Sequence, residues 1–163
     1  MRTMGIDLGI AKAAYSVWED DILVKTDAKA SASGYRTTQL YDISHFLVTE
    51  INLIQPNVIW IEDILIGNNR KYSIKLAQTM GAVLGALGRA RYENEVFSVN
   101  VSTWKKEVIG NGHAKKEDIQ NYIWNRDSAY SVLCDGDQDR FDAACIGYYG
   151  VVIANRAGAM AQS

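Results

Sequence analysis

The residue with the clearest chemical potential in this chain is an aspartate inside an apolar segment, residues 2–10. Strand alternation there places Gly5, Asp7 and Gly9 on one side, so open space lies beside the Asp7 carboxylate. A buried carboxylate without a partner is costly in free energy, and it therefore requires a hydrogen bond, a proton or a cation. We expect the other members of a site to lie around this position.

Three further acids fall where they can reach that carboxylate. Glu62 follows a continuously apolar segment, residues 58–61, which is typical of a strand buried on both faces. Asp139 and Asp142 lie three residues apart at the head of a helical apolar stripe, and therefore on one face of the helix. Alternatively, Glu62 is a solvated acid at a strand end, and the aspartates complement a helix dipole, which leaves Asp137 no further role.

Acids gathered in one pocket have a characteristic chemistry. Their mutual repulsion keeps some of them protonated unless cations are bound. Carboxylate oxygens suit magnesium and manganese as ligands. Two such ions about 4 Å apart activate a water and stabilise the leaving oxygen when a phosphodiester is hydrolysed. The acidic residues taken together therefore predict nuclease chemistry.

Hydrophobic patterning predicts the sheet that would position these acids. Apolar segments of strand length occur at residues 2–10, 13–18, 21–26, 58–61 and 95–101. The first three follow one another closely and predict an antiparallel meander, whereas the fourth follows a helical pattern that stops at Pro56. The sequence therefore predicts an α/β fold whose five-stranded mixed sheet has three antiparallel strands, then two parallel ones, flanked by helices.

Apolar residues at helical spacing predict the remaining elements. The predicted helices cover residues 40–54, 72–91, 104–109, 115–125 and 138–155, and the predicted longer loops are residues 27–37 and 126–137. Ser102 or Thr103 is expected to cap the third helix.

The helix over residues 72–91 carries an apolar stripe beside a smooth one made by Gly81, Gly85 and Gly88. Together the two stripes cover more of the helix circumference than one sheet can bury. Glycines inside a helix cost roughly 0.5 to 1 kcal/mol each relative to alanine. They therefore indicate the close approach of another backbone, which is either the protein's own sheet or a second copy of the chain.

Composition is that of an ordinary globular domain, with 48% hydrophobic and 22% charged residues. We expect one domain over residues 1–157 and a flexible tail over residues 158–163. The chain has no apolar run of 18 residues and no signal pattern, so we expect a cytoplasmic protein without a membrane partner. Cys134 and Cys145 are expected to be reduced packing residues. The net charge of −2 requires any nucleic-acid surface to be local.

Several short motifs follow one another in a specific order. They are Gly-Ile-Asp-Leu-Gly at residues 5–9, the three antiparallel strands, Ile61-Glu62, Gly-His-Ala-Lys-Lys-Glu at 112–117, and Asp139-Arg-Phe-Asp142-Ala-Ala. Their order and spacing resemble those of the RuvC family of Holliday junction resolvases over roughly residues 4–150. The resemblance implies a ribonuclease H-like fold and a homodimer with two active sites, which makes paired magnesium-dependent nicks in opposite strands of a four-way DNA junction.

The resemblance also implies roles for individual residues. The implied catalytic and metal-binding acids, with two Mg²⁺ ions per site that Mn²⁺ can replace, are Asp7, Glu62, Asp139 and Asp142. Lys105 and Lys116 match family lysines that serve the scissile phosphate and the DNA backbone, although they can also be read as a solvated helix face. Leu65 matches the place of an aromatic residue that wedges into the opened junction, and a leucine can wedge but stacks poorly. His113 is more simply an exposed loop residue.

The predicted function is that of a magnesium-dependent endodeoxyribonuclease that resolves four-way or branched DNA during recombination and repair. One alternative is a ribonuclease H-like nuclease that acts on structured RNA, for which the same acids would be needed. The other is a protein that binds junctions without cutting them, and the presence of all four acids argues against it.

Overall fold

The computed structural model describes residues 1–64 and 69–161. Its strands are β1 (Arg2–Leu8), β2 (Lys12–Glu19), β3 (Ile22–Ala30), β4 (Val58–Glu62) and β5 (Glu95–Val99). Its helices are α1 (Arg36–Ile54), α2 (Arg70–Arg89), α3 (Val101–Ile109), α4 (Lys116–Arg126), α5 (Ser128–Cys134) and α6 (Gln138–Met160). None of the helices in these residues is long and apolar enough to cross a membrane.

The five strands form one mixed sheet in the order β3-β2-β1-β4-β5. Strands β1, β2 and β3 pair antiparallel, and β4 and β5 continue the sheet in parallel with β1. The predicted sheet is confirmed. Strand β1 lies at its centre, which places Asp7 between β2 on one side and the end of β4 on the other.

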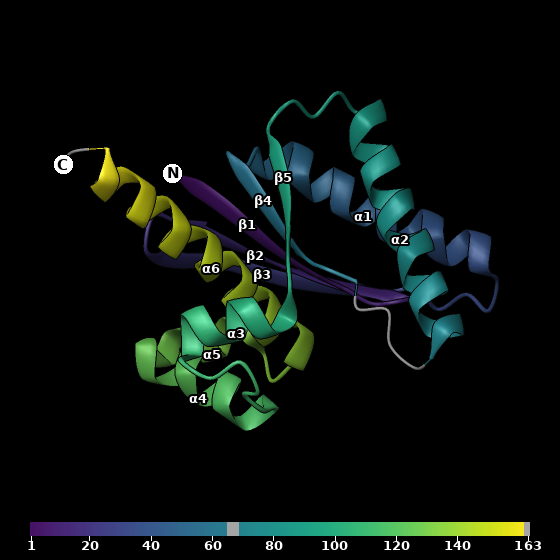
Figure 1. Ribbon diagram of the computed structural model, residues 1–163. Helices are drawn as coiled ribbons and strands as arrows, with labels where there is room; N and C mark the ends of the chain where they lie inside the picture. Colours follow the sequence, from purple (N-terminus) through teal and green to yellow (C-terminus); the bar gives the residue numbers. More distant parts are fainter. Residues whose placement is uncertain (65–68, 162–163) are drawn as a thin grey trace.

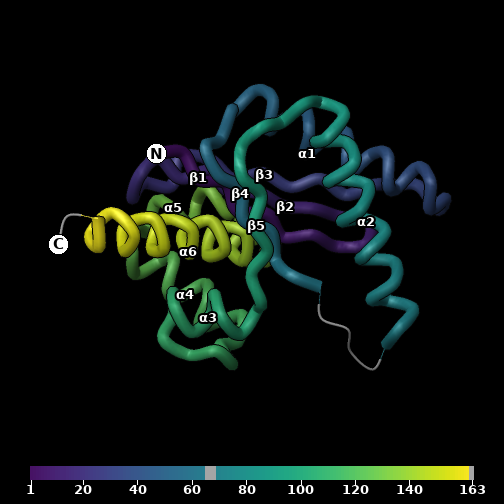
Figure 2. Tube along the Cα trace, turned by 45° about the horizontal axis from the view of Figure 1, so that its top comes forward, coloured from purple at the N-terminus to yellow at the C-terminus, as the bar shows by residue number. Residues whose placement is uncertain are grey.

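Helices cover both faces of the sheet (Figures 1 and 2). Met4, Ile6 and Leu8 point to the face covered by α1 and α2, where they form one core with residues such as Leu47 and Val83. The opposite face is covered by α6, beyond which α3, α4 and α5 build a second core. As the strand alternation predicts, Asp7 therefore faces α6.

Helix α6 packs directly against the central strands because glycines, which have no side chain, lie on both surfaces at the contact, Gly5 on β1 and Gly147 on α6. A Cβ atom added at Gly5 would overlap the backbone nitrogen of Gly147 and the carbonyl oxygen of Ala143. The Ser16 hydroxyl donates a hydrogen bond of 2.7 Å to the same carbonyl, and the Trp18 indole donates one of 3.0 Å to the Ala144 carbonyl. These contacts set the position of α6 along β1, and with it the position of the acids in its first turns.

The beginning of α3 differs from the prediction. The cap is Asn100, whose side chain accepts a hydrogen bond of 3.0 Å from the Ser102 backbone, and not Ser102 or Thr103. Strand β5 consequently ends at Val99 and the helix begins at Val101. Asparagine and serine cap helices about equally well, so residue preference could not choose between neighbouring candidates.

Two predicted loops contain regular structure. Residues 128–134 of the predicted loop 126–137 form α5, which the Asp127 side chain caps through the Ala129 backbone at 2.9 Å. The predicted loop 27–37 shrinks because β3 continues to Ala30 and α1 begins at Arg36.

Helix α6 continues to Met160, so residues 158–160 are helical where a tail was predicted. The alanines on both sides of Gly158 are strong helix formers, and they carry the helix past the glycine. Cys134 and Cys145 are free and buried, as predicted.

Candidate active site

The site forms where the carboxyl ends of β1 and β4 meet the first turns of α6. Parallel pairing sets Ile6 opposite Ile61, so the next residues along the two strands, Asp7 and Glu62, are neighbours. Burial raises the pKa of Asp7 well above its usual value, and the charges of Asp142, Glu62 and Asp139 raise it further. The structure thus brings the other three predicted acids close enough to act on Asp7.

Glu62 is held in place by a tryptophan. The Trp104 indole nitrogen, in α3, donates a hydrogen bond of 2.8 Å to Glu62 Oε2. Burial raises the pKa of the Glu62 carboxyl; the Trp104 hydrogen bond opposes this increase, while the charge of Asp142 adds to it. This contact was not predicted, because an indole in an apolar helix stripe is ordinarily a packing residue.

Asp142 is oriented by two glutamines. Gln138 Nε2 donates a hydrogen bond of 2.9 Å to Asp142 Oδ1, and Gln120 Nε2 in turn donates one of 3.0 Å to Gln138 Oε1. Burial raises the pKa of Asp142, and the Gln138 hydrogen bond and the charge of Lys105 oppose that increase. This chain of amides links α4 to the acid and was not predicted.

Asp139 differs from the other acids because it is paired with a lysine. Lys12 Nζ, at the start of β2, lies 2.7 Å from Asp139 Oδ2 and 2.7 Å from both carboxylate oxygens of Asp137. Asp137 also caps α6, accepting a hydrogen bond of 3.0 Å from the Asp139 backbone. The alternative in which Asp137 only complements the helix dipole and has no further role is therefore wrong. Neither Lys12 nor Asp137 was a predicted site residue.

The two predicted lysines border the acids in different ways. Lys105 Nζ donates a hydrogen bond of 2.9 Å to the Ala114 carbonyl, and its charge lowers the pKa of both Glu62 and Asp142. Lys116 is exposed at the start of α4, and its charge also lowers the pKa of Asp142. Leu65, the predicted wedge, lies outside the described residues.

The donor set fits a hard divalent cation. Burial and carboxylate charges both raise the pKa of Asp7, Glu62 and Asp142, and a divalent cation would offset both effects. As the side chains stand in residues 1–64 and 69–161, no three His, Cys, Asp or Glu residues are grouped to hold an ion. Lys12 engages one of the two carboxylate oxygens of Asp139, Oδ2.

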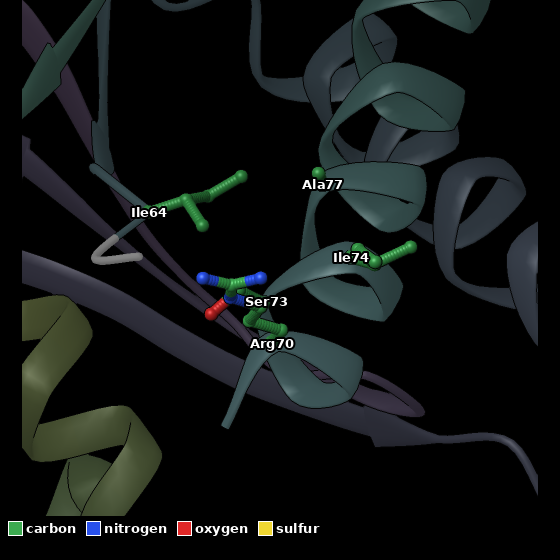
Figure 3. A pocket seen from close by; sticks show the side chains of 5 residues that line it. All are labelled: Ile64, Arg70, Ser73, Ile74 and Ala77. Carbon is green, nitrogen blue, oxygen red and sulfur yellow. The ribbon is translucent and has the colours of Figure 1, made fainter. Parts of the chain in front are cut away.

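An apolar cavity lies between Ile64 and the beginning of α2. It has a volume of about 420 Å³, and Ile64 faces the first turns of α2 across it (Figure 3). The described lining residues are Ile64, Arg70, Ser73, Ile74 and Ala77, and they include none of the four acids. The cavity therefore offers none of the four carboxylates to a ligand.

We expect Asp142→Asn to stabilise the metal-free protein at neutral pH. Because the folded-state pKa of Asp142 is raised, ionising this carboxyl destabilises the fold, and the destabilisation grows as pH rises from the unfolded pKa to the folded one. In chelator the variant should melt higher than the wild type by roughly 2–4 °C at pH 7 and by less near pH 4. Scanning calorimetry at both pH values measures this difference.

Magnesium should shrink or reverse that difference, because the wild type binds the ion better and is stabilised by it. Glu93→Gln, which removes a negative charge at an exposed position, is the matched control. It should melt at the wild-type temperature both in chelator and in magnesium. An Asp142→Asn protein that is less stable than the wild type in chelator, with both melting points unmoved by magnesium, would make Asp142 an ordinary helix-end acid.

A family model described as crossover junction endodeoxyribonuclease RuvC matches residues 3–125. The chain belongs to the RuvC family. RuvC of Rickettsia prowazekii is 31% identical over 156 residues, which cover 91% of this chain and 95% of the relative. The family consists of metal-dependent nucleases. The match includes Asp7 and Glu62 but ends before Asp139 and Asp142, whose assignment depends on their proximity to Asp7.

Solved RuvC structures share the fold. Thermus thermophilus RuvC superposes with a TM-score of 0.77 at 19% identity, over 96% of this chain and 97% of the other. The same protein in complex with a Holliday junction substrate gives a TM-score of 0.77 at 20% identity, over 96% of each chain. The predicted ribonuclease H-like fold class is confirmed.

Proposed function

We propose that this RuvC-family protein is a magnesium-dependent endodeoxyribonuclease that resolves four-way or branched DNA junctions. The observation that carries the proposal is the convergence of Asp7, Glu62 and Asp142, three half-buried carboxyls with raised pKa values, where the ends of two parallel strands meet α6. Charged groups held in this way are costly without a cation. The arrangement thus favours ion binding over a purely structural role.

We infer two Mg²⁺ ions per site, which Mn²⁺ can replace, held by Asp7, Glu62, Asp139 and Asp142. Bound divalent ions supply an activated water and stabilise the charge that develops on the leaving oxygen. The chain's own contribution is orientation, since Trp104 fixes one of these carboxylates and Gln138 fixes another. Lys105 stands next to both, where an ammonium group can meet a scissile phosphate.

Branched DNA is the substrate that the relatives support, because a RuvC of the same fold is known in complex with a Holliday junction substrate. We propose a cytoplasmic location, because the enzyme must reach the DNA on which it acts.

The test of the proposed function is incubation of the purified protein with a synthetic four-way junction, a matched duplex and an RNA hairpin, in magnesium or chelator. We expect paired nicks in the junction alone, and only in magnesium. Equal cutting of the RNA hairpin would favour the alternative substrate.

Lys105 and Lys116 are proposed to contact DNA phosphates. Each phosphate contact contributes about one unit to the slope of log affinity against log salt concentration. Lys116→Ala and Lys105→Ala should therefore each flatten that slope by about one unit when junction binding is measured by fluorescence anisotropy. Lys29→Ala, on β3, is the control for loss of one exposed positive charge. If both variants keep the wild-type slope, the two lysines are solvated residues of a helix face and do not contact DNA phosphates.

A two-fold homodimer through α2 is also proposed. Apart from the neighbouring backbone of α2 itself, no described heavy atom lies within 4 Å of a Cβ built at Gly81, Gly85 or Gly88, so packing against the protein's own sheet does not explain these glycines. Leu84, on the same helix, keeps 44% of its surface exposed. A bare helix surface beside an exposed leucine allows a second backbone to approach closely, and two-fold pairing would supply two active sites for paired nicks.

We expect Gly85→Leu to weaken this dimer by at least about tenfold, because overpacking a close contact typically costs about 1–3 kcal/mol. Light scattering across a micromolar concentration series measures the change. Gly158→Leu introduces the same side chain at an open position near the end of α6 and should leave the dimer intact. A wild type that is monomeric throughout the series would rule out the interface.

A further inference from the structure

We propose that Lys12 is a built-in counter-cation of the acid cluster, which holds Asp139 when no metal is bound and must release it for a divalent ion to bind. This inference rests on the proposed metal site. It concerns a residue that lies outside the four acids and belongs to a different element, the beginning of β2.

The first observation is that the Lys12 ammonium is fully used. An ammonium group has three N–H donors. Three carboxylate oxygens lie 2.7 Å from Nζ, two belonging to Asp137 and one to Asp139. A lysine that served only to fasten the start of α6 to β2 would need Asp137 alone, which already caps the helix. Drawing Asp139 into the same contact takes an acid out of the cluster.

The second observation is the charge balance around the site. Both members of the ion pair act electrostatically on Asp7, Asp139 as a like charge and Lys12 as an opposite charge. The Lys12 side chain keeps 36% of its surface exposed, and it can therefore move into solvent when its partners are taken by another cation. Lys12 thus partly neutralises the acid cluster and leaves it accessible to another cation.

Removing the positive charge of Lys12 should affect cation binding in two ways, and both should strengthen it. Removing the Lys12 charge frees Asp139 to act as a ligand, and it also makes the site more negative. Lys12→Gln should therefore bind Mn²⁺ more tightly than the wild type, by roughly tenfold. The metal-free form of the variant should be less stable, because Asp137 and Asp139 lose the cation that they share.

Isothermal titration calorimetry with Mn²⁺ tests this on the wild type, Lys12→Gln and Lys25→Gln. The last variant is a matched control, because Lys25 forms an ion pair of the same length, 2.7 Å, with Glu50 away from the site. Lys25→Gln should bind as the wild type does. In an Asp139→Asn background, the gain from Lys12→Gln should fall well below tenfold, since the freed ligand is missing.

Equal or weaker Mn²⁺ binding by Lys12→Gln, with normal binding by the wild type, would overturn the role of Lys12 and leave the metal site standing. Absence of binding in both proteins would overturn the metal site and this inference together.

A second measurement needs no variant, in case Lys12→Gln fails to fold. Saturating Mg²⁺ should shift the ¹⁵N resonance of the Lys12 ammonium in the wild type and leave that of Lys25 in place. A Lys12 resonance that does not move while Mg²⁺ binds would also contradict the proposal.

Discussion

Asp7→Asn should cut a four-way junction roughly 1,000-fold more slowly than the wild type while binding it with nearly unchanged affinity. Asp7 is the acid on which the charges of Asp142, Glu62 and Asp139 all act, so it lies at the electrostatic centre of the cluster. Asparagine keeps the shape of the side chain but loses the charge that a cation requires. Affinity for DNA comes mainly from basic residues, and it should persist.

Single-turnover cleavage in magnesium measures the rate, and anisotropy in calcium measures binding. The control is Asp63→Asn, which removes an exposed charge immediately after Glu62 and should leave the rate within about twofold of the wild type. Cleavage by Asp7→Asn at the wild-type rate would remove Asp7 from the mechanism.

Gly5→Ala should destabilise the protein by about 3 kcal/mol, because overpacking a tight contact between two backbones leaves no flexible side chain to move aside. The added methyl group would overlap Gly147 and Ala143 of α6, so the helix must move away from the central strand. Urea denaturation followed by circular dichroism measures the loss.

Gly158→Ala is the matched control for that experiment, because a Cβ there meets no described atom within 4 Å. It should change stability by less than about 1 kcal/mol, and in the stabilising direction. A Gly5→Ala protein as stable as the wild type would mean that α6 does not approach β1 as closely as described, and the placement of Asp139 and Asp142 would then be in doubt.

Strand alternation and helical spacing were sufficient to predict the sheet and the face on which the acids lie. Asp7 is recognisable because it breaks an apolar strand, and Asp142 because it continues a buried helix stripe. Both signals are local, since each depends on residues within a few positions.

Contacts across long sequence separations could not be predicted in the same way. Lys12 meets Asp137 from 125 positions away, and Trp104 meets Glu62 from 42. Such pairs depend on where α6 and α3 lie along the sheet. For α6 that position is set by the tertiary contact of Gly5 with Gly147 and Ala143, which no local sequence pattern reveals. Helix α5 was missed because seven residues make too short a periodic pattern.

The most direct test of the acid cluster is the position of Mn²⁺ in crystals of the wild-type protein, read from anomalous diffraction. A manganese peak about 2.1 Å from carboxylate oxygens of Asp7, with Glu62 or Asp142 among its other ligands, is the predicted result. We also expect Lys12 to have left Asp139 in that structure. Manganese bound elsewhere, with the four acids metal-free at saturating concentration, would contradict the assignment of these acids to metal-dependent DNA cleavage.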